Sequence, residues 1–507
     1  MLIRPLRFAL IAAGAAFVFF GSSLPVFSSP GDVPTRKADK EEGQKLLKEG
    51  DELADKKKYD DAVARYKQAF EQLLPNMRKL PFKNEVKRDA TTRKDLRAYL
   101  IKEMDEDQTA EEFKGDETAM KALGVIPKSM DLHETMTRLL TEEIAAFYDP
   151  KTKAIHTIKE DGSVKRPEPG FLEKLLLGKK GEFDKEENKT VLAHELTHAL
   201  ADQTYDLLTL QRKIKGDDDR DLALSALIEG EATLTMTAAQ AKDWNGEDTI
   251  KIPAKRMESL IDILAPMMTR SGGATLREAP PILAETLIFP YMRGLIFCMK
   301  LTNEGGWDAI DAAYKEPPLS TEQVLHFEKY RGPDRDEPTR LELGKLDAGD
   351  GWKEVSRNVF GEWQIAVMLR GKPGSSTAAA GWDGDRFAAF VGPEDRLGLV
   401  WETTWDSEKD AKEFAEAYAA FQTAKLGKDV PQPEAIEASL RRSNGPAVFA
   451  VERKGVDVAI VEGFSAETTE KLVQAALLAK KSPKTQEPTA EAIRAELKRK
   501  ETEDKTK

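Results

Sequence analysis

Residues 191 to 200 read Val-Leu-Ala-His-Glu-Leu-Thr-His-Ala-Leu, and this stretch decides how the rest of the chain is interpreted. It lies inside a helical pattern that extends from residue 186 to residue 212. His194 and His198 are four residues apart, so their imidazoles project from one face of a helix. The other positions of the stretch, apart from Glu195, are uncharged. We therefore expect a buried helix that carries two histidines and one carboxylate.

Two imidazoles at this spacing can bind one tetrahedral Zn²⁺, and a glutamate beside the first histidine can take a proton from metal-bound water. The chain has only five histidines, so a chance match to this H-E-x-x-H pattern is improbable. His194 and His198 are thus predicted metal ligands, and Glu195 is the predicted catalytic base.

A catalytic zinc needs a third protein ligand and keeps its fourth position for water. The next helical pattern, residues 219–243, places Glu229 and Glu231 in an otherwise apolar stripe, where a buried carboxylate needs a cation. Glu229 is the predicted ligand because the following Gly230 would let two helices approach closely. Glu231 is the competing candidate, or a carboxylate that lies behind the ligands.

Two segments of this region resemble a known family. Residues 194–199 resemble the active helix of thermolysin-like gluzincins, and Glu229-Gly230-x-Ala232 resembles the second helix of aminopeptidase-type gluzincins. The resemblance covers residues 186–236 and implies zincin-like architecture, a glutamate as third zinc ligand and peptide hydrolysis. Residues 145–158 and 320–326 resemble parts of a bacterial branch of such enzymes.

The chain departs from the thermolysin-like pattern at Thr233, where those enzymes carry an aspartate. The group that orients a ligand histidine must therefore come from elsewhere, and Asp202, one turn beyond His198, is our candidate. Tyr291 and His326 are candidates for stabilising an oxyanion, because both are polar groups in apolar, loop-adjacent settings. A core tyrosine and a helix-capping histidine are the alternative interpretations.

The pattern along the whole chain predicts a mostly helical α+β protein in several parts. They are a signal peptide (1–29), a linker with a helical hairpin like one tetratricopeptide repeat (30–79), a zincin-like metallopeptidase domain (80–345), a small α/β domain (346–480) and a charged tail (481–507). The small domain is predicted to repeat a ββα unit, since paired short strands are twice followed by a helix whose expected N-cap is serine, Ser407 or Ser465.

Upstream of the active helix, residues 145–158 predict a β-hairpin within a segment that is otherwise helical from residue 80. We expect its second strand, residues 155–158, to run along the metal cleft with one edge open to a substrate strand. The run Asp217-Asp218-Asp219 is interpreted as the acidic N-terminus of a helix rather than a calcium site.

Composition limits the cellular setting and the partners. With 40% hydrophobic and 33% charged residues, the chain is typical of a soluble globular protein, and its net charge of −12 argues against nucleic acid as a partner. The single cysteine, Cys298, excludes an intrachain disulfide and a cysteine-based zinc site. Residues 1–29 have the basic start and apolar run of an export signal. An uncleaved anchor is the alternative, and would be the chain's only contact with a membrane.

Together these features predict an exported, periplasmic or extracellular, Zn²⁺-dependent metallopeptidase that acts on peptides or proteins. Two alternatives stay open. One is a non-catalytic, metal-containing binding or scaffold protein. The other is a zinc hydrolase of non-peptide amides.

Overall fold

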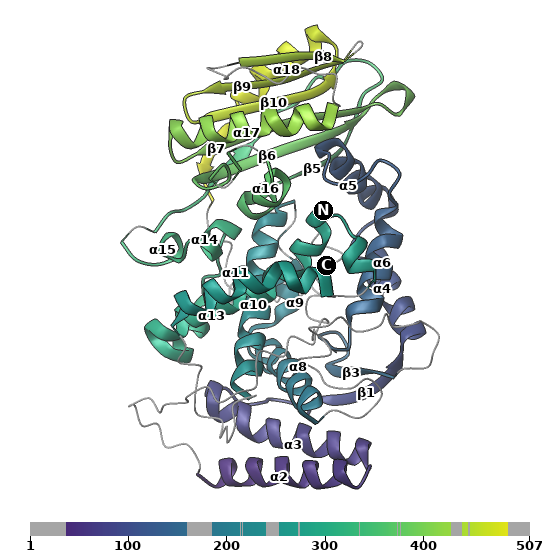
Figure 1. The fold of residues 1–507 in the computed structure, drawn as a ribbon, viewed down its shortest axis with the longest axis vertical. Coiled ribbons are helices and arrows are strands. Elements are labelled where there is room, and N and C mark those ends of the chain that lie inside the picture. Colours follow the sequence, from purple (N-terminus) through teal and green to yellow (C-terminus); the bar gives the residue numbers. More distant parts are fainter. Residues whose placement is uncertain are drawn as a thin grey trace, which may run out of the picture.

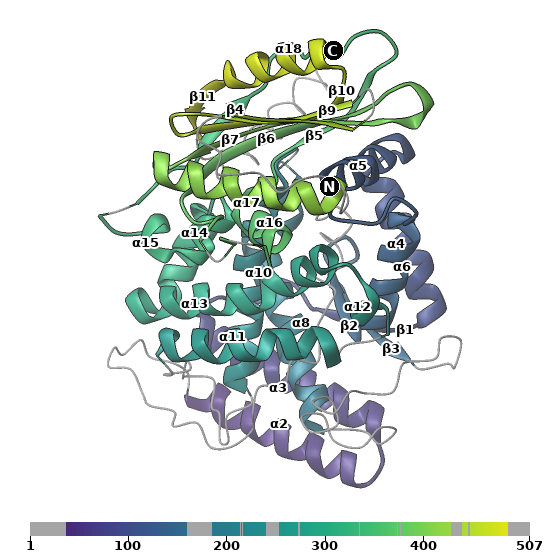
Figure 2. The ribbon, with the colours of Figure 1, turned by 45° about the horizontal axis from the view of Figure 1, so that its top comes forward.

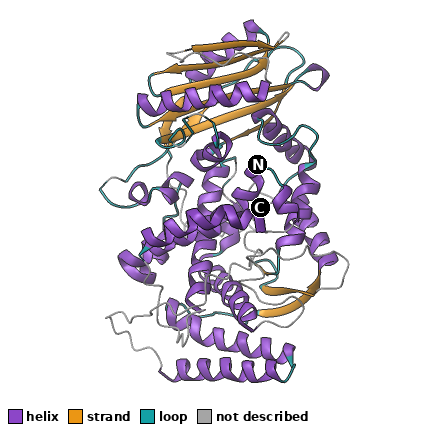
Figure 3. Cartoon of the chain, in the orientation of Figure 1, coloured by secondary structure: helices purple, strands orange, loops and turns teal. Residues whose placement is uncertain are grey.

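The computed structural model describes residues 37–159, 185–239, 253–426 and 439–484, apart from residues 213, 215, 272–273, 334, 373, 376 and 445–446. Within these ranges the chain is a mixed α+β protein in which helices predominate (Figure 3). The expected signal peptide, the linker up to residue 36 and the tail from residue 485 lie outside the described residues.

The N-terminal helices α2 (Lys37–Asp55) and α3 (Tyr59–Arg78) form the predicted antiparallel hairpin, at the lower end of Figure 1. Gly50 allows the close contact between the two helices, since a Cβ there would lie 2.4 Å from the Tyr66 ring. Helix α3 also packs on α8 (Lys185–Tyr205), as expected for a single repeat that cannot bury its apolar face alone.

The segment before the active helix holds β1 (Lys87–Thr92), α4 (Arg93–Asp107), α5 (Ala110–Leu123), α6 (Leu132–Glu143), β2 (Ala146–Asp149) and β3 (Ala154–Lys159). Strands β2 and β3 form the predicted antiparallel hairpin. Strand β1 was not expected, because its sequence Lys-Arg-Asp-Ala-Thr-Thr is polar and was interpreted as part of a helical segment. It pairs in parallel with β3, so the sheet order is β1-β3-β2.

Helices α8, α9 (Leu207–Arg212), α10 (Asp218–Ala239), α11 (Ala254–Ser271), α12 (Ala274–Glu278) and α13 (Pro281–Lys315) form the centre of the protein. Helix α13 starts at Pro281, the first helical position, at which proline favours a helix start. Among the described residues, α13 is the one helix whose length and apolar composition would suffice for a membrane span, and most of it lies buried inside the protein.

The last part contains α14 (Thr321–Leu325), α15 (Phe327–Tyr330), β4 (Thr339–Glu342), β5 (Lys353–Asn358), α16 (Gly361–Leu369), β6 (Trp382–Val391), β7 (Leu397–Trp405), α17 (Glu408–Leu426), β8 (Ser439–Asn444), β9 (Ala447–Lys454), β10 (Asp457–Phe464), α18 (Ala466–Leu477) and β11 (Lys480–Pro483). Six of these strands form one antiparallel sheet of order β5-β6-β7-β10-β9-β8. The predicted ββα units are β6-β7-α17 and β9-β10-α18, and they meet at the β7–β10 pair.

Figure 2 shows the sheet between α18 on its outer side and α17 on the side that faces the helical body. Alternate residues of the strands serve the two sides. Val400 and Val461 pack in a small outer core with Leu472 of α18, whereas Phe387 and Trp401 belong to the large core shared with the central helices. Helix α5 also packs on this sheet, so the part expected at 346–480 shares its inner core with the preceding region.

The C-terminal end of the described chain is more ordered than the expected charged tail. Strand β11 pairs with β4, and Lys484 is only 5% exposed. Its Nζ lies 2.9 Å from Asp217 Oδ2, which fixes residue 484 beside the start of α10. The charged tail can therefore begin only after this lysine.

Helices α10 and α13 cross where each has a glycine. A Cβ at Gly230 would lie 2.2 Å from the carbonyl oxygen of Gly294, and a Cβ at Gly294 would lie 2.1 Å from that of Ala226. The close helix approach expected at Gly230 is thus present, and its partner is α13. A side chain at either glycine would therefore force the two helices apart, because the atoms it meets belong to the backbone.

We expect Gly230→Ala and Gly294→Ala each to lower the free energy of unfolding by about 1–3 kcal/mol or more, since the added methyl group overpacks a backbone contact. Urea denaturation checks this. Gly344→Ala is the control, because nothing lies within 4 Å of a Cβ there. Equal stability of the Gly230, Gly294 and Gly344 variants would contradict the packing described.

Candidate metal centre

Helix α8 carries His194, Glu195 and His198 at the centre of the protein. Their exposed fractions are 1%, 0% and 1%. The helix is enclosed because it packs against α3 on one side, α10 on another and the β2–β3 hairpin on a third. The uncharged neighbours of the two histidines, such as Leu196 and Ala199, are accordingly fully buried, as the sequence predicted.

Glu229 of α10 completes a group of three potential ligands. Its Oε2 lies 3.1 Å from His194 Nε2 and 3.4 Å from His198 Nε2, and the two Nε2 atoms are 2.9 Å apart. These three atoms all lie within 4.8 Å of one another. Three donor atoms from two helices therefore converge on one point.

The donor set fits a zinc ion. With metal–nitrogen distances of about 2.0–2.1 Å, two ligands of a tetrahedral ion lie about 3.3 Å apart. The three observed separations, 2.9, 3.1 and 3.4 Å, are close to that value. The Nδ1 atoms of both histidines have no hydrogen-bond partner among the described residues, so no such bond within that part of the chain fixes their tautomers.

Burial determines the charge of these groups. Desolvation lowers the pKa of His194, and it lowers that of His198 to about 4, so both imidazoles are neutral near pH 7 and each can offer a nitrogen lone pair. Desolvation raises the pKa of Glu229 to about 7, although hydrogen bonds from His194 and Tyr291 act in the opposite direction. The carboxylate of Glu229 is therefore buried beside two neutral imidazoles and not beside a cationic side chain of the described residues.

Glu231, the competing ligand candidate, is engaged elsewhere. Its Oε1 accepts a hydrogen bond from Arg78 Nε, and its Oε2 accepts one from the Tyr314 hydroxyl at 2.6 Å. Arg78, at the end of α3, is 0% exposed, and its other end is 2.7 Å from Asp311. The carboxylate of Glu231 therefore faces the N-terminal hairpin, and Glu229 faces the histidines.

Glu195 is held by the hairpin that precedes the helix. The backbone N–H of Tyr148 in β2 donates to Glu195 Oε2 at 2.7 Å, and the Tyr148 hydroxyl donates to Asp202 Oδ2 at 2.8 Å. Lys153 Nζ lies 2.6 Å from the same oxygen of Asp202. Asp202 thus ties the hairpin to α8, and its other oxygen accepts from the backbone N–H of Leu207. We expected it to orient a ligand histidine instead.

The open substrate edge expected on residues 155–158 is not present, because β1 pairs with one side of β3 and β2 with the other. Strand β2 pairs with β3 alone among the described strands. The Tyr148 N–H points away from β3 toward Glu195. The strand edge that faces the predicted catalytic base therefore belongs to β2.

The two oxyanion candidates lie in different places. Tyr291 of α13 is 2% exposed, its ring is 6.2 Å from that of His194, and it is hydrogen-bonded to Glu229. His326, between α14 and α15, instead lies 2.9 Å from Glu362 Oε1, which raises its pKa. Tyr291 belongs to the centre, and the partners of His326, Glu362 and Glu328, lie outside it.

Sequence reasoning missed Arg78, Tyr314 and Tyr148 as parts of this region. Tyr148 lay in the predicted hairpin, but nothing in its local pattern indicated that its amide would face Glu195. Arg78 and Tyr314 are 153 and 83 residues from Glu231 in the chain. A buried carboxylate at Glu231 was a signal that a cation must be near, without indicating which one.

Comparison with known proteins gives one match. A family model described as a domain of unknown function (DUF8575) matches residues 349–473, which form most of the six-stranded sheet with α16 and α17 and most of α18. No curated protein and no solved structure matches the chain. The match lies outside the residues of the metal centre.

We expect Glu229→Gln, His194→Ala and His198→Ala each to lower zinc occupancy strongly, because each removes one of three convergent donors. Glu231→Gln is the matched control. It should keep the metal while losing about 1–3 kcal/mol of stability, since it weakens the buried bond to Arg78. Metal analysis of the purified variants checks both. Loss of zinc in Glu231→Gln with retention in Glu229→Gln would reverse the assignment.

Proposed function

We propose that this chain is a zinc-dependent metallopeptidase. The observation that carries the proposal is the convergence of His194, His198 and Glu229, with Glu195 directly beside the first histidine. Two histidines and a glutamate are a ligand set used by catalytic zinc sites, which leave one position for water.

In this proposal the two imidazoles and Glu229 hold the ion, and Tyr291 fixes the Glu229 carboxylate from behind. Bound zinc would polarise the substrate carbonyl and lower the pKa of a water molecule. Glu195 accepts the proton of the attacking water and then delivers it to the leaving amine nitrogen. Before substrate enters, the hydrogen bond from Tyr148 N–H holds the carboxylate that would perform both transfers.

A purely structural metal is the first alternative, and the donor count speaks against it. Structural zinc is almost always bound by four protein ligands. In the described part of the chain, the group contains three residues. A structural ion would also not account for Glu195, whose carboxylate is 0% exposed beside the ligands although burying a carboxylate is costly.

The β2 strand supports a peptide substrate over a non-peptide amide. An extended peptide can bind by adding a strand to a sheet edge, which gives register without requiring particular side chains. Strand β2 has its outer edge next to Glu195, and it is part of a mixed sheet that precedes the active helix in the chain. We infer that β2, rather than β3, aligns the substrate.

Catalysis also requires movement, because the centre is enclosed. The side chains of the centre are at most 1% exposed; they are His194, Glu195, His198 and Glu229. The Tyr148 amide that would pair with a substrate strand is bonded to Glu195. In our proposal, substrate entry breaks this bond and separates β2 from α8.

Glu195→Gln should retain zinc and lose peptide hydrolysis by about 10²–10⁴-fold, because the ligands stay while the base is removed. Cleavage of a quenched fluorescent peptide library, with metal analysis of the same samples, measures both. Glu186→Gln, in the first turn of the same helix and with its side chain 67% exposed, is the control and should behave as the parent protein. Near-normal cleavage by Glu195→Gln would refute the mechanism.

Metal removal gives a separate test. Dialysis against a chelator should abolish hydrolysis, and one equivalent of zinc should restore it. The metal-free protein should also unfold at a lower temperature, since Glu229 is then buried without a cation. A metal-free protein that hydrolyses peptides, or that binds no zinc, would contradict the proposal.

A further inference from the structure

A cavity of about 420 Å³ lies away from the metal centre, between the first turn of α10 and the strands β4, β5 and β6. Its wall carries five cationic side chains, from Arg220, Arg340, Arg357, Arg386 and Lys484, and three carboxylates. Cavities of this size accept small organic ligands. Such a cavity can bind an anion only if some of these cations are not already paired with carboxylates of the protein.

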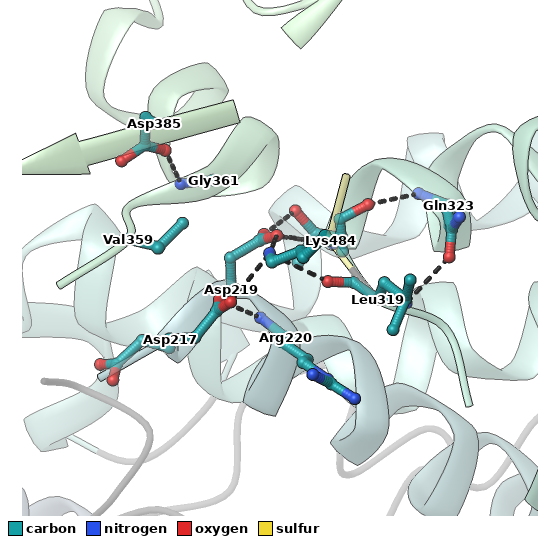
Figure 4. Close-up of polar contacts among 12 residues, drawn as sticks. Asp217, Asp219, Arg220, Leu319, Gln323, Val359, Gly361, Asp385 and Lys484 are labelled. Atoms are coloured by element: carbon teal, nitrogen blue, oxygen red, sulfur yellow. Dashed lines mark hydrogen bonds and ion pairs between the residues drawn. The ribbon is translucent and has the colours of Figure 1, made fainter. Parts of the chain in front are cut away.

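Two of the three carboxylates, Asp385 and Asp217, already bind other groups of the protein. Asp385 accepts hydrogen bonds from the backbone N–H groups of Phe360 and Gly361, at 2.8 and 2.7 Å, and from two tryptophan indoles. Asp217 accepts from the backbone N–H of Arg220 and pairs with Lys484. Figure 4 shows Lys484 reaching between Asp217, Asp219 and the carbonyl of Leu319, and Asp385 directed at Gly361.

The third carboxylate, Glu342, lies at the rim and pairs with Arg340 at 3.0 Å. The Arg340 side chain is 62% exposed, so this pair is weak and easily exchanged for another anion. Arg357 is fixed by Glu354 and by the carbonyls of Leu343 and Gly344. It contributes positive potential to the cavity from a fixed position.

Arg386 remains without a carboxylate. It is half-buried, it donates to the carbonyl of Gly216, and no acidic oxygen of the described residues lies within 4.0 Å of it. Burial is the main effect, and it lowers the pKa of Arg386. The charges of Asp217 and Asp385 oppose this effect, and those of Arg357 and Arg340 add to it. A desolvated guanidinium that faces like charge in a cavity is costly unless an anion accompanies it.

We propose that this cavity is a binding site for a small molecule that carries an oxyanion, a phosphate or a cluster of carboxylates, with Arg386 as its anchor. The planar fork of arginine matches both groups through two parallel hydrogen bonds. Arg340 closes on the ligand from the rim, and Arg357 adds positive charge, whereas Lys484 is already paired with Asp217. The cavity is larger than one phosphate group, so the ligand has a body beyond its charged end.

To test this, the full chain is titrated with pyrophosphate and, separately, with citrate. Sodium chloride keeps the ionic strength constant. Calorimetry gives the affinity, and the melting temperature gives an independent measure through linkage. Saturable binding of either anion is expected. Stronger binding of pyrophosphate would identify a phosphate ligand, and stronger binding of citrate a carboxylate ligand.

Two variants locate the site. Arg386→Gln should weaken the affinity about tenfold or more, because it removes a charge-assisted bidentate contact. Arg340→Gln should weaken it less, and its exposed position protects the fold. Arg396, the residue before β7, is exposed, so Arg396→Gln is the matched control and should bind as the parent does.

Three results would overturn the proposal. They are no binding of either anion beyond the effect of chloride, equal affinity in the Arg340→Gln and Arg396→Gln variants, and unchanged affinity in a folded Arg386→Gln protein. Because zinc content and peptide cleavage are not used as readouts, the outcome is independent of the function proposed for the metal centre.

Discussion

A carboxylate buried on α10 has to meet positive charge, and this constraint organises the centre of the protein. Glu229 and Glu231 are two residues apart and lie at 0% and 1% exposure. Glu231 meets the guanidinium of Arg78, which also binds Asp311 and stacks on Trp307 at 4.7 Å. Glu229 meets two neutral imidazoles, and in our proposal a metal cation supplies the missing positive charge.

This division gives the N-terminal hairpin a role in the centre. A single repeat of this kind cannot form a peptide-binding superhelix, and here its second helix packs on α8 and places Arg78 behind α10. The Gly230–Gly294 contact holds α10 against α13 from the other side, and α13 brings Tyr291 to Glu229. Three separate parts of the chain therefore fix the position of one ligand.

The C-terminal sheet contributes in a different way. Its inner face shares the large core with the central helices. Lys484, which follows β11 of the separate β11–β4 pair, binds Asp217 at the start of α10. The proposed anion site lies at this junction, since α10 supplies one wall and the strands supply the arginines. Helix α10 thus has the proposed anion site at its first turn and Glu229, the proposed metal ligand, one residue before Gly230.

The sequence was sufficient wherever the information is local. The spacing of His194 and His198, the uncharged residues around them, the helical hairpin at the N-terminus and the two ββα units follow from periodicity, capping and turn residues. Glu229 could be preferred over Glu231 because Gly230 marks a close helix contact, and that contact is present. Such features depend on residues a few positions apart, which secondary structure brings together in a fixed geometry.

Tertiary structure alone decided the contacts between distant residues. The polar segment Lys87–Thr92 has no strand pattern of its own, yet it pairs with β3 and removes the open edge expected there. Asp202 lies one turn beyond His198 on α8, as expected. Its carboxylate, however, is bound by Tyr148 and Lys153 of the hairpin. Arg78 finds Glu231 across 153 residues. Pairings of this kind depend on how whole elements pack and on which buried charge lacks a partner, and no local pattern of residues specifies that outcome.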